Sequence, residues 1–411
     1  MARSLRSLLA FFPATALLAT GGAAVAQTTP PTVSCIDASR PNLIYVAGST
    51  ALRPFLGTMA QVLAKETPAY TIVYQGQGSC TGVSAILSDD PAKQVIKDIP
   101  AAGGKAANYA IFFKADGSAQ ECSLDAAGNT VDLGVSDVFA ASCGQTAGAN
   151  VADYLGPIQP MAFVVPAASS QRSISAEAAY LALGLGGAGG KAAPWTDPSL
   201  FFVRNASSGT QQMIARAIGV PGERWWGKDR GGSGAVVSGL KVLLTPDVAE
   251  KSLGILSSDL ADAERNNLRI LAFRAKGQDC GFLPDSTLAS KDKVNVRDGH
   301  YPIWGPVHLF ARTSGALPNA AAGAFVTRFA TVRVDKTLID ALIDKSLVPQ
   351  CAMRVSRTSE LGALASFSPE FQCGCYFDAR TTGASSCKTC QVPADCPAST
   401  PACNLGFCEA K

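Results

Sequence analysis

Histidine and charged residues are scarce in this sequence. Only two of the 411 residues are histidines, and Asp, Glu, Lys and Arg together make up 16% of the chain. Two histidines leave little for a histidine-dependent nucleophile or a metal site, and no serine lies in a G-x-S-x-G turn. The formal net charge is only +3, and no basic stretch carries interleaved aromatic residues, so the sequence does not indicate a nucleic acid or an anionic membrane as partner.

Long apolar runs are also missing, except close to the N-terminus. Two arginines precede an apolar run over residues 8–18, and a small-residue stretch then ends in the A-x-A pattern Ala24-Val-Ala26. This arrangement predicts a signal peptide over residues 1–26 and a mature chain that begins at Gln27. A retained anchor is the weaker alternative, because spanning a bilayer takes roughly 20 apolar residues. The expected location is the periplasm, with display at the cell surface as an alternative.

Thirteen cysteines agree with export, because an oxidising compartment turns thiols into disulfides. In the body of the chain, pairing in sequence order is one of many possible connectivities: Cys35 with Cys80, Cys122 with Cys143, and Cys280 with Cys351. The remaining seven cysteines lie within residues 373–408, so one of them pairs outside this group or stays free. Cys387-x-x-Cys390 has the spacing of a zinc or redox pair, but structural disulfides are favoured in so cysteine-dense a tail.

The body of the chain alternates short β-rich segments with helical patterns. Strands are expected near residues 42–46, 71–74 and 131–135, and helices near residues 54–65, 83–87, 176–183 and 211–218. Strand, glycine-rich turn and helix in repetition predict an α/β fold with a parallel sheet. The looser stretch 89–130 is interpreted as a surface excursion.

The length suits two domains rather than one compact core. Apolar runs at 161–165 and 307–311 are candidates for two strands that cross between the domains, with a helix-rich section between them. The final stretch, 373–408, is rich in Cys, Pro, Thr and Ala and is too short to hold a core without disulfides.

Two glycine-rich patterns do not have the context that nucleotide binding requires. Gly184-Leu-Gly-Gly-Ala-Gly189 satisfies G-x-G-x-x-G but follows a helical run, whereas a dinucleotide site needs a strand-to-helix turn. Gly190-Lys191 is followed by alanine, so the hydroxyl of a P-loop is missing. No cofactor and no metal site are therefore expected, and the chain is not expected to be an enzyme.

Three turns of glycine and small hydroxyl residues each precede a predicted helix: Gly48-Ser-Thr50, Gly78-Ser79 and Ser207-Ser-Gly-Thr210. Free backbone N–H groups at a helix start bind anions readily, although one such turn alone is more often a simple N-cap. Arg204 precedes the third turn, and its planar guanidinium matches two oxygens of a tetrahedral anion. The combination predicts an oxyanion site.

Asp137 ends the strand expected at 131–135, where a carboxylate would repel an anion. It would be tolerated by an anion that still carries a proton to donate, as phosphate does near neutral pH and sulfate does not. An aspartate that caps the next helix is an equally acceptable interpretation of this residue.

These motifs resemble those of the periplasmic phosphate-binding proteins of phosphate ABC importers. Tyr74-Gln-Gly-Gln-Gly-Ser79-Cys-Thr-Gly82 is similar to that family's Y-Q-G-x-G-S-x-G-G turn, and the segment from Val131 to Asp137 is similar to its V-D-F-G-A-S-D strand end. Arg204 with the following Ser-Gly-Thr matches R-x-D-G-S-G-T, although Ala206 and Ser207 replace the Asp and Gly. Gly231-Gly-Ser-Gly234 resembles a later glycine turn.

The resemblance spans residues 42–366 and implies a two-lobed periplasmic-binding-protein-like fold of type II, with hinge crossing strands and a disulfide-rich tail. The implied units are lobe I (27–160 and 303–370), lobe II (161–302) and the tail (371–411). The implied phosphate ligands are Thr50, Ala51, Ser79, Asp137, Arg204, Ser208, Gly209 and Thr210. The implied partners are inorganic phosphate and the membrane permease of an ABC importer, with the protein itself a monomer.

Three alternatives remain open at this point. The lobes could be reused in a surface-displayed sensor or scaffold, a possibility raised by the added tail. The ligand could be another oxyanion such as arsenate, or a phosphorylated compound. A phosphate-ester hydrolase is least favoured, because it would need a nucleophile with a base, or metal ligands.

Overall fold

The computed structural model describes residues 30–102, 106–186, 192–313, 320–331 and 334–410. The predicted signal peptide and most of the glycine-rich stretch before Lys191 lie outside the described residues. Among the described residues, no helix is both long enough and apolar enough to cross a bilayer.

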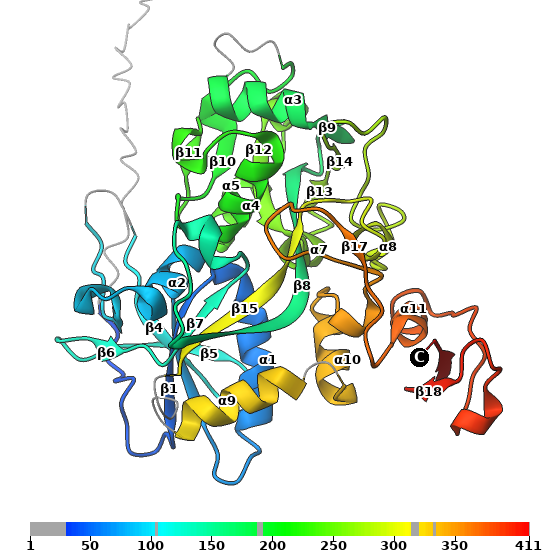
Figure 1. The fold of residues 1–411 in the computed structure, drawn as a ribbon. Helices are drawn as coiled ribbons and strands as arrows, with labels where there is room; N and C mark the ends of the chain where they lie inside the picture. The colour runs from blue at the N-terminus through cyan, green and yellow to red at the C-terminus, as the bar shows by residue number, and fades with distance from the viewer. Residues whose placement is uncertain (1–29, 103–105, 187–191, 314–319, 332–333, 411) are drawn as a thin grey trace, which may run out of the picture.

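One mixed sheet of 11 strands runs through both halves of the molecule (Figure 1). Its strands, in spatial order, are β11 (Lys228–Asp229), β10 (Phe201–Val203), β12 (Leu253–Ser257), β8 (Val151–Pro166), β15 (Trp304–Arg312), β7 (Leu133–Ser136), β1 (Leu43–Gly48), β2 (Thr71–Gly76), β4 (Ala110–Phe113) and β5 (Ala119–Cys122), with β13 (Leu268–Ile270) paired to β8. Within each half the inner strands are parallel: β1 with β2 and β7, and β10 with β11 and β12.

The long strand β8 joins the two halves. As far as Pro160 it pairs with β15, and from Met161 onward it pairs with β12 and β13. We propose that this change of partner marks the boundary between lobe I (27–160 and 303–370) and lobe II (161–302). The expected two-lobed α/β architecture with crossing strands is what the structure shows.

Most of the helices flank this sheet, and they begin where the local sequence favours a helix start. They are α1 (Arg53–Leu63), α2 (Ser79–Leu87), α3 (Ala176–Ala179), α4 (Gly209–Ile218), α5 (Ser233–Lys241), α6 (Pro246–Lys251), α7 (Ser258–Ala263), α8 (Val294–Arg297), α9 (Ala320–Thr331), α10 (Lys336–Asp344) and α11 (Gly374–Thr382). Helix α1 has a proline in its first turn and buries Phe55, Met59 and Leu63 along one face. Helix α4 is N-capped by Ser208 and ends at Gly219, whose φ of +73° is the left-handed conformation that glycine adopts at low cost.

The apolar side chains gather in several clusters. In lobe I, Val46 of β1 and Leu309 of β15 pack with Phe325 and Phe329 of α9. A second cluster surrounds Phe163 of β8 in lobe II and continues into lobe I and the tail. The apolar core therefore runs across the boundary between the lobes.

The interpretation of residues 89–130 as a surface excursion is wrong in part. Strand β4 lies within this stretch, pairs with β2 in the main sheet, and has all four residues buried. Strand β5 extends the sheet beyond it. The apolar run Ala-Ile-Phe-Phe at 110–113 supplies enough apolar surface for a buried strand, while the connecting segments lie at the surface.

The sequence-order disulfide pairing is also wrong. The bonds in the body are Cys35–Cys122 and Cys80–Cys143, and Cys280 is exposed and forms no disulfide. The first bond forms because the segment before β1 lies beside β5, where the Cys35 N–H donates to the Ser123 carbonyl at 2.8 Å. Sequence proximity did not decide the pairing, because the partners of each bond are 87 and 63 residues apart.

Disulfides crosslink the cysteine-rich tail and attach it to the body of the protein. Its bonds are Cys375–Cys387, Cys390–Cys403 and Cys396–Cys408, while Cys373 pairs with Cys351 of the body. Of the two outcomes expected for the seventh tail cysteine, pairing outside the tail is the one observed, at Cys373. Arg297 of α8 forms an ion pair with Asp378 of α11, and the Tyr376 hydroxyl donates to the Asp340 carboxylate of α10.

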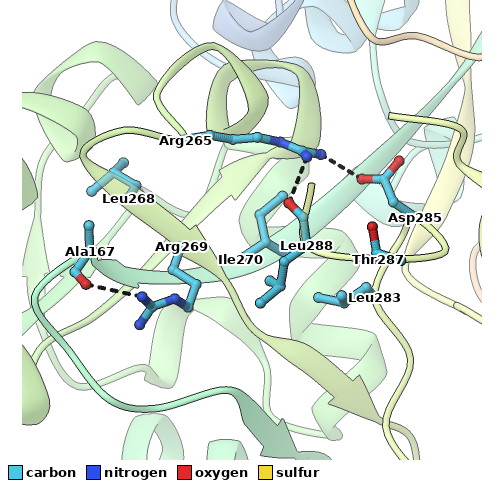
Figure 2. A pocket seen from close by; sticks show the side chains of 9 residues that line it. All are labelled: Ala167, Arg265, Leu268, Arg269, Ile270, Leu283, Asp285, Thr287 and Leu288. Carbon is cyan, nitrogen blue, oxygen red and sulfur yellow. Dashed lines mark hydrogen bonds and ion pairs between the residues drawn. The ribbon is translucent and has the colours of Figure 1, made fainter. Parts of the chain in front are cut away.

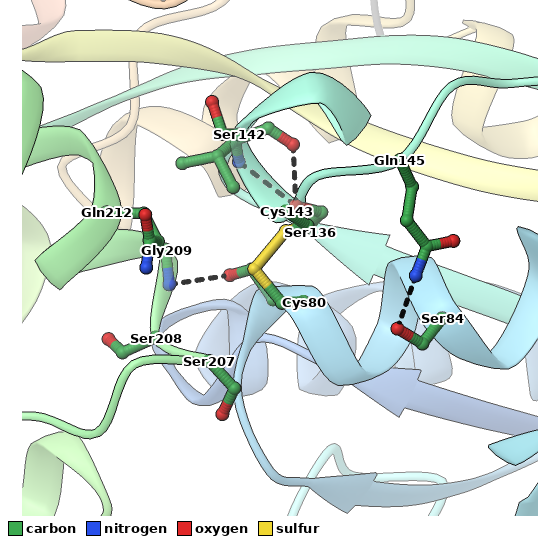
Figure 3. The surroundings of a disulfide bond; sticks show 12 residues. Cys80, Ser84, Ser136, Ser142, Cys143, Gln145, Ser207, Ser208, Gly209 and Gln212 are labelled. Carbon is green, nitrogen blue, oxygen red and sulfur yellow. Dashed lines mark hydrogen bonds between the residues drawn. A yellow bond between two sulfur atoms is a disulfide. The ribbon is translucent and has the colours of Figure 1, made fainter. Parts of the chain in front are cut away.

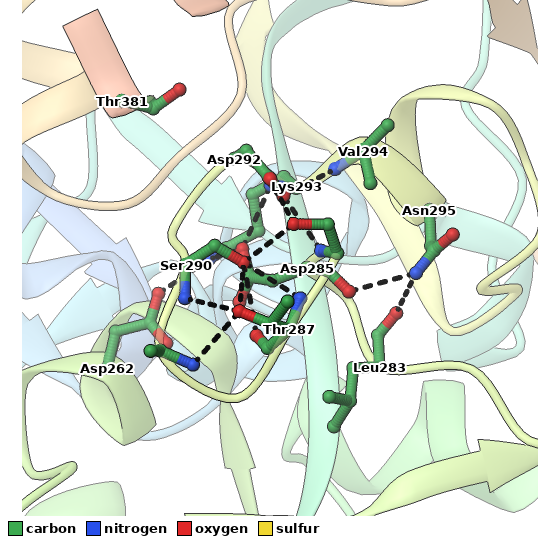
Figure 4. A network of polar contacts seen from close by, with 12 residues as sticks. Asp262, Leu283, Asp285, Thr287, Ser290, Asp292, Lys293, Val294, Asn295 and Thr381 are labelled. Atoms are coloured by element: carbon green, nitrogen blue, oxygen red, sulfur yellow. Dashed lines mark hydrogen bonds and ion pairs between the residues drawn. The ribbon is translucent and has the colours of Figure 1, made fainter. Parts of the chain in front are cut away.

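A buried network holds the loop between Leu283 and Asn295 against lobe II (Figure 4). The fully buried Lys293 ammonium donates to Asp262 at 2.6 Å and to Asp285 at 2.8 Å. Removing one partner of such a buried pair leaves an uncompensated charge. The network is therefore a structural brace of lobe II.

Another buried carboxyl group lies where β8 passes between the lobes. The Gln159 amide of β8 donates to Asp259 Oδ1 of α7 at 3.0 Å. Burial raises the pKa of Asp259 from 3.8 to about 6, partly opposed by hydrogen bonds from Ser257 and Gln159. Because the folded pKa lies above the unfolded one, this group stabilises the fold less as pH rises from about 4 to about 6.

Asp259→Asn is expected to remove that dependence. Relative to the native protein, the variant should gain about 2 kcal/mol of unfolding free energy between pH 4 and pH 7, because a shift of one pKa unit is worth about 1.4 kcal/mol. Denaturant unfolding at the two pH values measures the difference. Equal pH dependence of the two proteins would show that Asp259 does not titrate in this range.

Candidate functional site

The carboxyl ends of parallel strands from both lobes meet at one place between the lobes. From lobe I, β1 ends before Ser49, β2 ends before Gly78 and α2, and β7 ends before Asp137. From lobe II, β10 ends before Arg204 and the start of α4. Ligand sites of open α/β sheets lie at such strand ends, because short turns present backbone N–H groups and side chains there.

Asp137 is the central residue on the lobe I side and is 1% exposed. Its carboxylate accepts hydrogen bonds from the Ser49 hydroxyl at 2.9 Å and from the Ser79 hydroxyl. Burial raises the pKa of Asp137, against the lowering effect of these two hydroxyls. The group is therefore well placed to accept a proton, since burial disfavours its charged form.

Arg204 is the central residue on the lobe II side and is 2% exposed. Its guanidinium donates to the hydroxyls of Thr50 at 3.0 Å and Ser233 at 2.6 Å, and to the Gly231 carbonyl at 2.8 Å. Burial lowers its pKa to about 10, so the group stays cationic at neutral pH.

All three of these acceptors are neutral, and within the described part of the chain no carboxylate lies within ion-pair distance of Arg204. Asp137 and Asp229 favour the charged form of Arg204 only through space, without contact. A buried cation whose direct contacts are all neutral favours an anion beside it, because such a contact offsets more of the cost of desolvation.

The first turn of α4 adds donors to the same place. The Gly209 N–H donates to the Ser79 hydroxyl at 3.2 Å, which links the two lobes. The Thr210 hydroxyl is buried and has no hydrogen-bond partner among the described residues. A buried hydroxyl without a partner at a helix start is a ready donor to an anion.

The two lobes touch directly around these residues. The Ser207 carbonyl accepts from the Cys80 N–H at 2.9 Å, and the Ser207 hydroxyl donates to the Gln77 carbonyl at 2.9 Å. Glycines allow this approach: a Cβ on Gly78 would lie 2.6 Å from the Ser207 carbonyl oxygen, and one on Gly209 would lie 1.7 Å from Asp137 Oδ1. Any ligand enclosed here has to be small.

A disulfide braces the lobe I side of the site (Figure 3). Cys80, in the first turn of α2, bonds to Cys143, the last residue of the 3₁₀ helix Ala140–Cys143 that follows Asp137. The turns that carry Ser79 and Asp137 are thereby joined covalently. In the figure, Ser207, Ser208 and Gly209 of lobe II lie beside this bond.

The structure brings most of the predicted ligand residues together. They form two hydrogen-bonded groups: Ser79 joins Asp137 to the Gly209 N–H, and Arg204 binds Thr50. The charge of Arg204 also lowers the pKa of Asp137 through space. The other predicted groups lie beside them: the Ala51 N–H donates to the Ser49 hydroxyl, the Ser208 hydroxyl caps α4 at the Gln211 N–H, and Thr210 is buried as described above.

Sequence reasoning missed two members of the set, Ser49 and Ser233. Both were visible in the sequence as hydroxyl residues within glycine turns that precede helices. Their roles depend on contacts with Asp137 and Arg204, which lie 88 and 29 residues away along the chain. Spacing alone could not assign those contacts.

The other chemistries considered find little support in the described residues. The sulfurs of Cys390, Cys396 and Cys408 lie within 4.8 Å of one another, but all three are in disulfides and are not thiolate ligands. His308 of β15 hydrogen bonds through Nδ1 to Asp153 at 2.8 Å, and His300 stacks on Phe282. Within the described residues, no hydrogen bond or ring contact joins either histidine to Asp137 or Arg204.

A separate hollow of about 250 Å³ lies on lobe II beside β13 (Figure 2). Two arginines line it, and their polar groups already have partners: Arg265 pairs with Asp285 at 2.7 Å, and Arg269 donates to the Ala167 carbonyl at 3.2 Å. The hollow is therefore a weaker anion-site candidate than the strand ends between the lobes.

A comparison with protein-family models finds no match, and a comparison with curated protein sequences finds none either. Among solved structures, the chain is similar to a putative phosphate ABC transporter substrate-binding protein with bound phosphate from Clostridium perfringens, at 13% identity and a TM-score of 0.48 over 75% of this chain and 99% of that one. It is also similar to an ABC-type phosphate transport receptor from Vibrio cholerae, at 14% identity and a TM-score of 0.43 over 74% and 99% of the two chains. A human phosphate binding apolipoprotein matches at 16% identity and a TM-score of 0.46 over 74% and 90%. These values describe a likeness in the overall arrangement of the chain, and the nature of a ligand has to come from the residues of the site.

Proposed function

We propose that this protein captures inorganic phosphate between its two lobes and delivers it to the membrane permease of an ABC importer. The observation that carries the proposal is the pairing of Arg204, a buried cation with only neutral partners, with Asp137, a buried proton acceptor, across one lobe contact. Monohydrogen phosphate satisfies both, because it is an anion that still has a proton to donate. The protein is then an exported monomeric binding protein of the periplasm and not an enzyme.

The direct test is calorimetric titration of the mature protein, stripped of ligand, with phosphate and separately with sulfate. Tight binding of phosphate with sulfate ignored is expected. Binding of arsenate in place of phosphate would shift the ligand to another protonated oxyanion. If none of the three anions bound, the proposal would be contradicted, and reuse of the lobes in a sensor or scaffold would be favoured.

The docked tail bears on that alternative. Cys351–Cys373 and the Arg297–Asp378 ion pair fix the tail to the body, so it is packed as a cap rather than held away from the lobes. Packing of this kind favours a role in bracing the fold over presentation of the lobes at a surface.

Asp137→Asn is expected to lower the preference for phosphate over sulfate by on the order of 100-fold, or about 3 kcal/mol. The native carboxylate accepts the proton of phosphate and repels sulfate, whereas an amide can donate to either anion. Competition titration of both anions measures the ratio. Asp89→Asn, which makes the same change at an exposed position, is the control. An unchanged ratio in the Asp137 variant would remove the discriminating role of that residue.

A further inference from the structure

A short hairpin near the C-terminal end of lobe I contacts the segment that follows Asp137. Strands β16 (Val355–Ser356) and β17 (Ala365–Ser366) form its stem, and residues 357–364 form its turn (Figure 1, orange). Arg357 anchors the turn at the start of β15: its guanidinium lies 3.9 Å from the centre of the Trp304 ring and donates to the Pro302 carbonyl at 3.0 Å. Trp304 belongs to the core cluster that includes residues of both lobes.

Glu360, in the same turn, reaches the segment that follows Asp137. Its Oε2 accepts from the Phe139 N–H at 2.9 Å and from the Ser142 hydroxyl at 2.8 Å. Its Oε1 is buried and has no hydrogen-bond partner among the described residues, and a Cβ added to Gly305 would lie 2.9 Å from it. The carboxylate is therefore inserted between β15 and the 139–142 segment.

The position of this segment matters to the site because it is the continuation of Asp137. On one side Asp137 is fixed by β7, which pairs with β1 and β15. On the other side the chain runs through Phe139 and Ser142 to Cys143, whose disulfide partner Cys80 follows Ser79. The two hydrogen bonds to Glu360 therefore fix this continuation of the chain from the side opposite the disulfide.

The hairpin is attached at two places. Arg357 packs on Trp304 at the start of β15, and Glu360, three residues later in the chain, binds the segment that follows Asp137. The hairpin therefore holds the 139–142 segment in a fixed position relative to β15, which also pairs with the strand that carries Asp137.

We propose that Glu360 is a positioning residue of the candidate site: it holds the segment 139–142, and thereby Asp137, in the geometry that retains the anion. This inference rests on the proposed phosphate-binding function. It assigns to the β16–β17 hairpin a part in ligand retention without any contact with the ligand.

The test compares Glu360→Ala with Glu370→Ala, a change of the same charge at an exposed position further along the chain. In the ligand-free protein, amide hydrogen exchange at Phe139 is expected to become at least about tenfold faster in Glu360→Ala and to stay unchanged in the control. Phosphate should dissociate about tenfold faster from the Glu360 variant, with a smaller change in the association rate. Glu360→Gln should restore part of the retention, because its amide oxygen can still accept one of the two bonds.

Ser142→Ala serves if Glu360→Ala does not fold, since it removes only one of the two hydrogen bonds and should give a smaller increase in dissociation. Native exchange at Phe139 in both variants would overturn the inference, and so would faster exchange with unchanged phosphate dissociation. If the unmodified protein binds no phosphate, the proposed function fails. The exchange measurement then decides by itself whether Glu360 holds the segment.

Discussion

Arg204→Ala should weaken phosphate binding by on the order of 100-fold or more, because truncating one partner of a buried charged hydrogen-bonded pair costs about 2–5 kcal/mol. The loss should appear mainly as faster dissociation, since a buried contact acts after the lobes have met. Titration calorimetry and rapid-mixing kinetics measure the two quantities. The folded protein should remain intact or become more stable without ligand, because the variant no longer has to bury a cation among neutral groups.

Arg274→Ala is the matched control in the same lobe. Arg274 forms an exposed ion pair with Glu177, and pairs of that kind contribute little to stability. Its removal should leave phosphate affinity unchanged. Near-native affinity in Arg204→Ala would show that the guanidinium does not face the ligand, and the assigned geometry of the site would be wrong.

Gly209→Ala should be nearly as damaging, although it adds only one methyl group. The new Cβ would lie 1.7 Å from Asp137 Oδ1 and 2.4 Å from Ser79 Oγ, and real Cβ atoms do not approach other atoms so closely. The lobes would have to stay apart at this point, and strain of about 1–3 kcal/mol from overpacking corresponds to a loss of affinity of about 10- to 100-fold. Lobe II itself should fold normally, because alanine is favourable in a helix.

Calorimetry again measures the affinity, and small-angle scattering with and without phosphate reports whether the lobes come together. The control is Gly148→Ala, where a Cβ would meet no atom within 4 Å. If Gly209→Ala bound phosphate as the native protein does, the direct contact between α4 and the Asp137 turn would not belong to the ligand-bound arrangement.

The two substitutions test two separate requirements of an anion site between the lobes, a positive charge and room for close approach. Arg204 is the buried cation of the proposed site, and Gly209 is the position where the lobes approach most closely. A protein that tolerated both changes would have no anion site between its lobes. If only the Arg204 variant lost phosphate affinity, the role of the guanidinium would stand. The lobes would then have to meet at a place other than Gly209.

Much of the site was predictable because its parts are local. A glycine and a hydroxyl residue before a helix start are a short-range pattern, and Ser208 at the start of α4 behaves as that pattern predicts. Arg204 before the same turn and Asp137 at the strand end could also be predicted as site residues from their immediate neighbours. The crossing strands followed from apolar runs at 161–165 and 307–311, which lie within β8 and β15.

The rest was decided only when distant segments packed together. Disulfide partners depend on which segments become neighbours in space. Cys35 bonds to Cys122, the last residue of edge strand β5, rather than to Cys80. Strand β4 is part of the main sheet because it pairs with β2, and this pairing buries its apolar run. Ser233 and Glu360 acquired their roles from partners 29 and 221 residues away.

The sequence by itself therefore determined the α/β alternation, the hydroxyl and glycine turns at the helix starts, and the apolar runs that form β8 and β15. These follow from propensity, capping and periodicity, which act over a few residues. Only the tertiary structure decided the disulfide partners, the edge of the sheet, and the contacts of Glu360 with the segment after Asp137. Those features depend on the closure of long loops, whose outcome is fixed by the packing of the whole chain rather than by any short stretch of it.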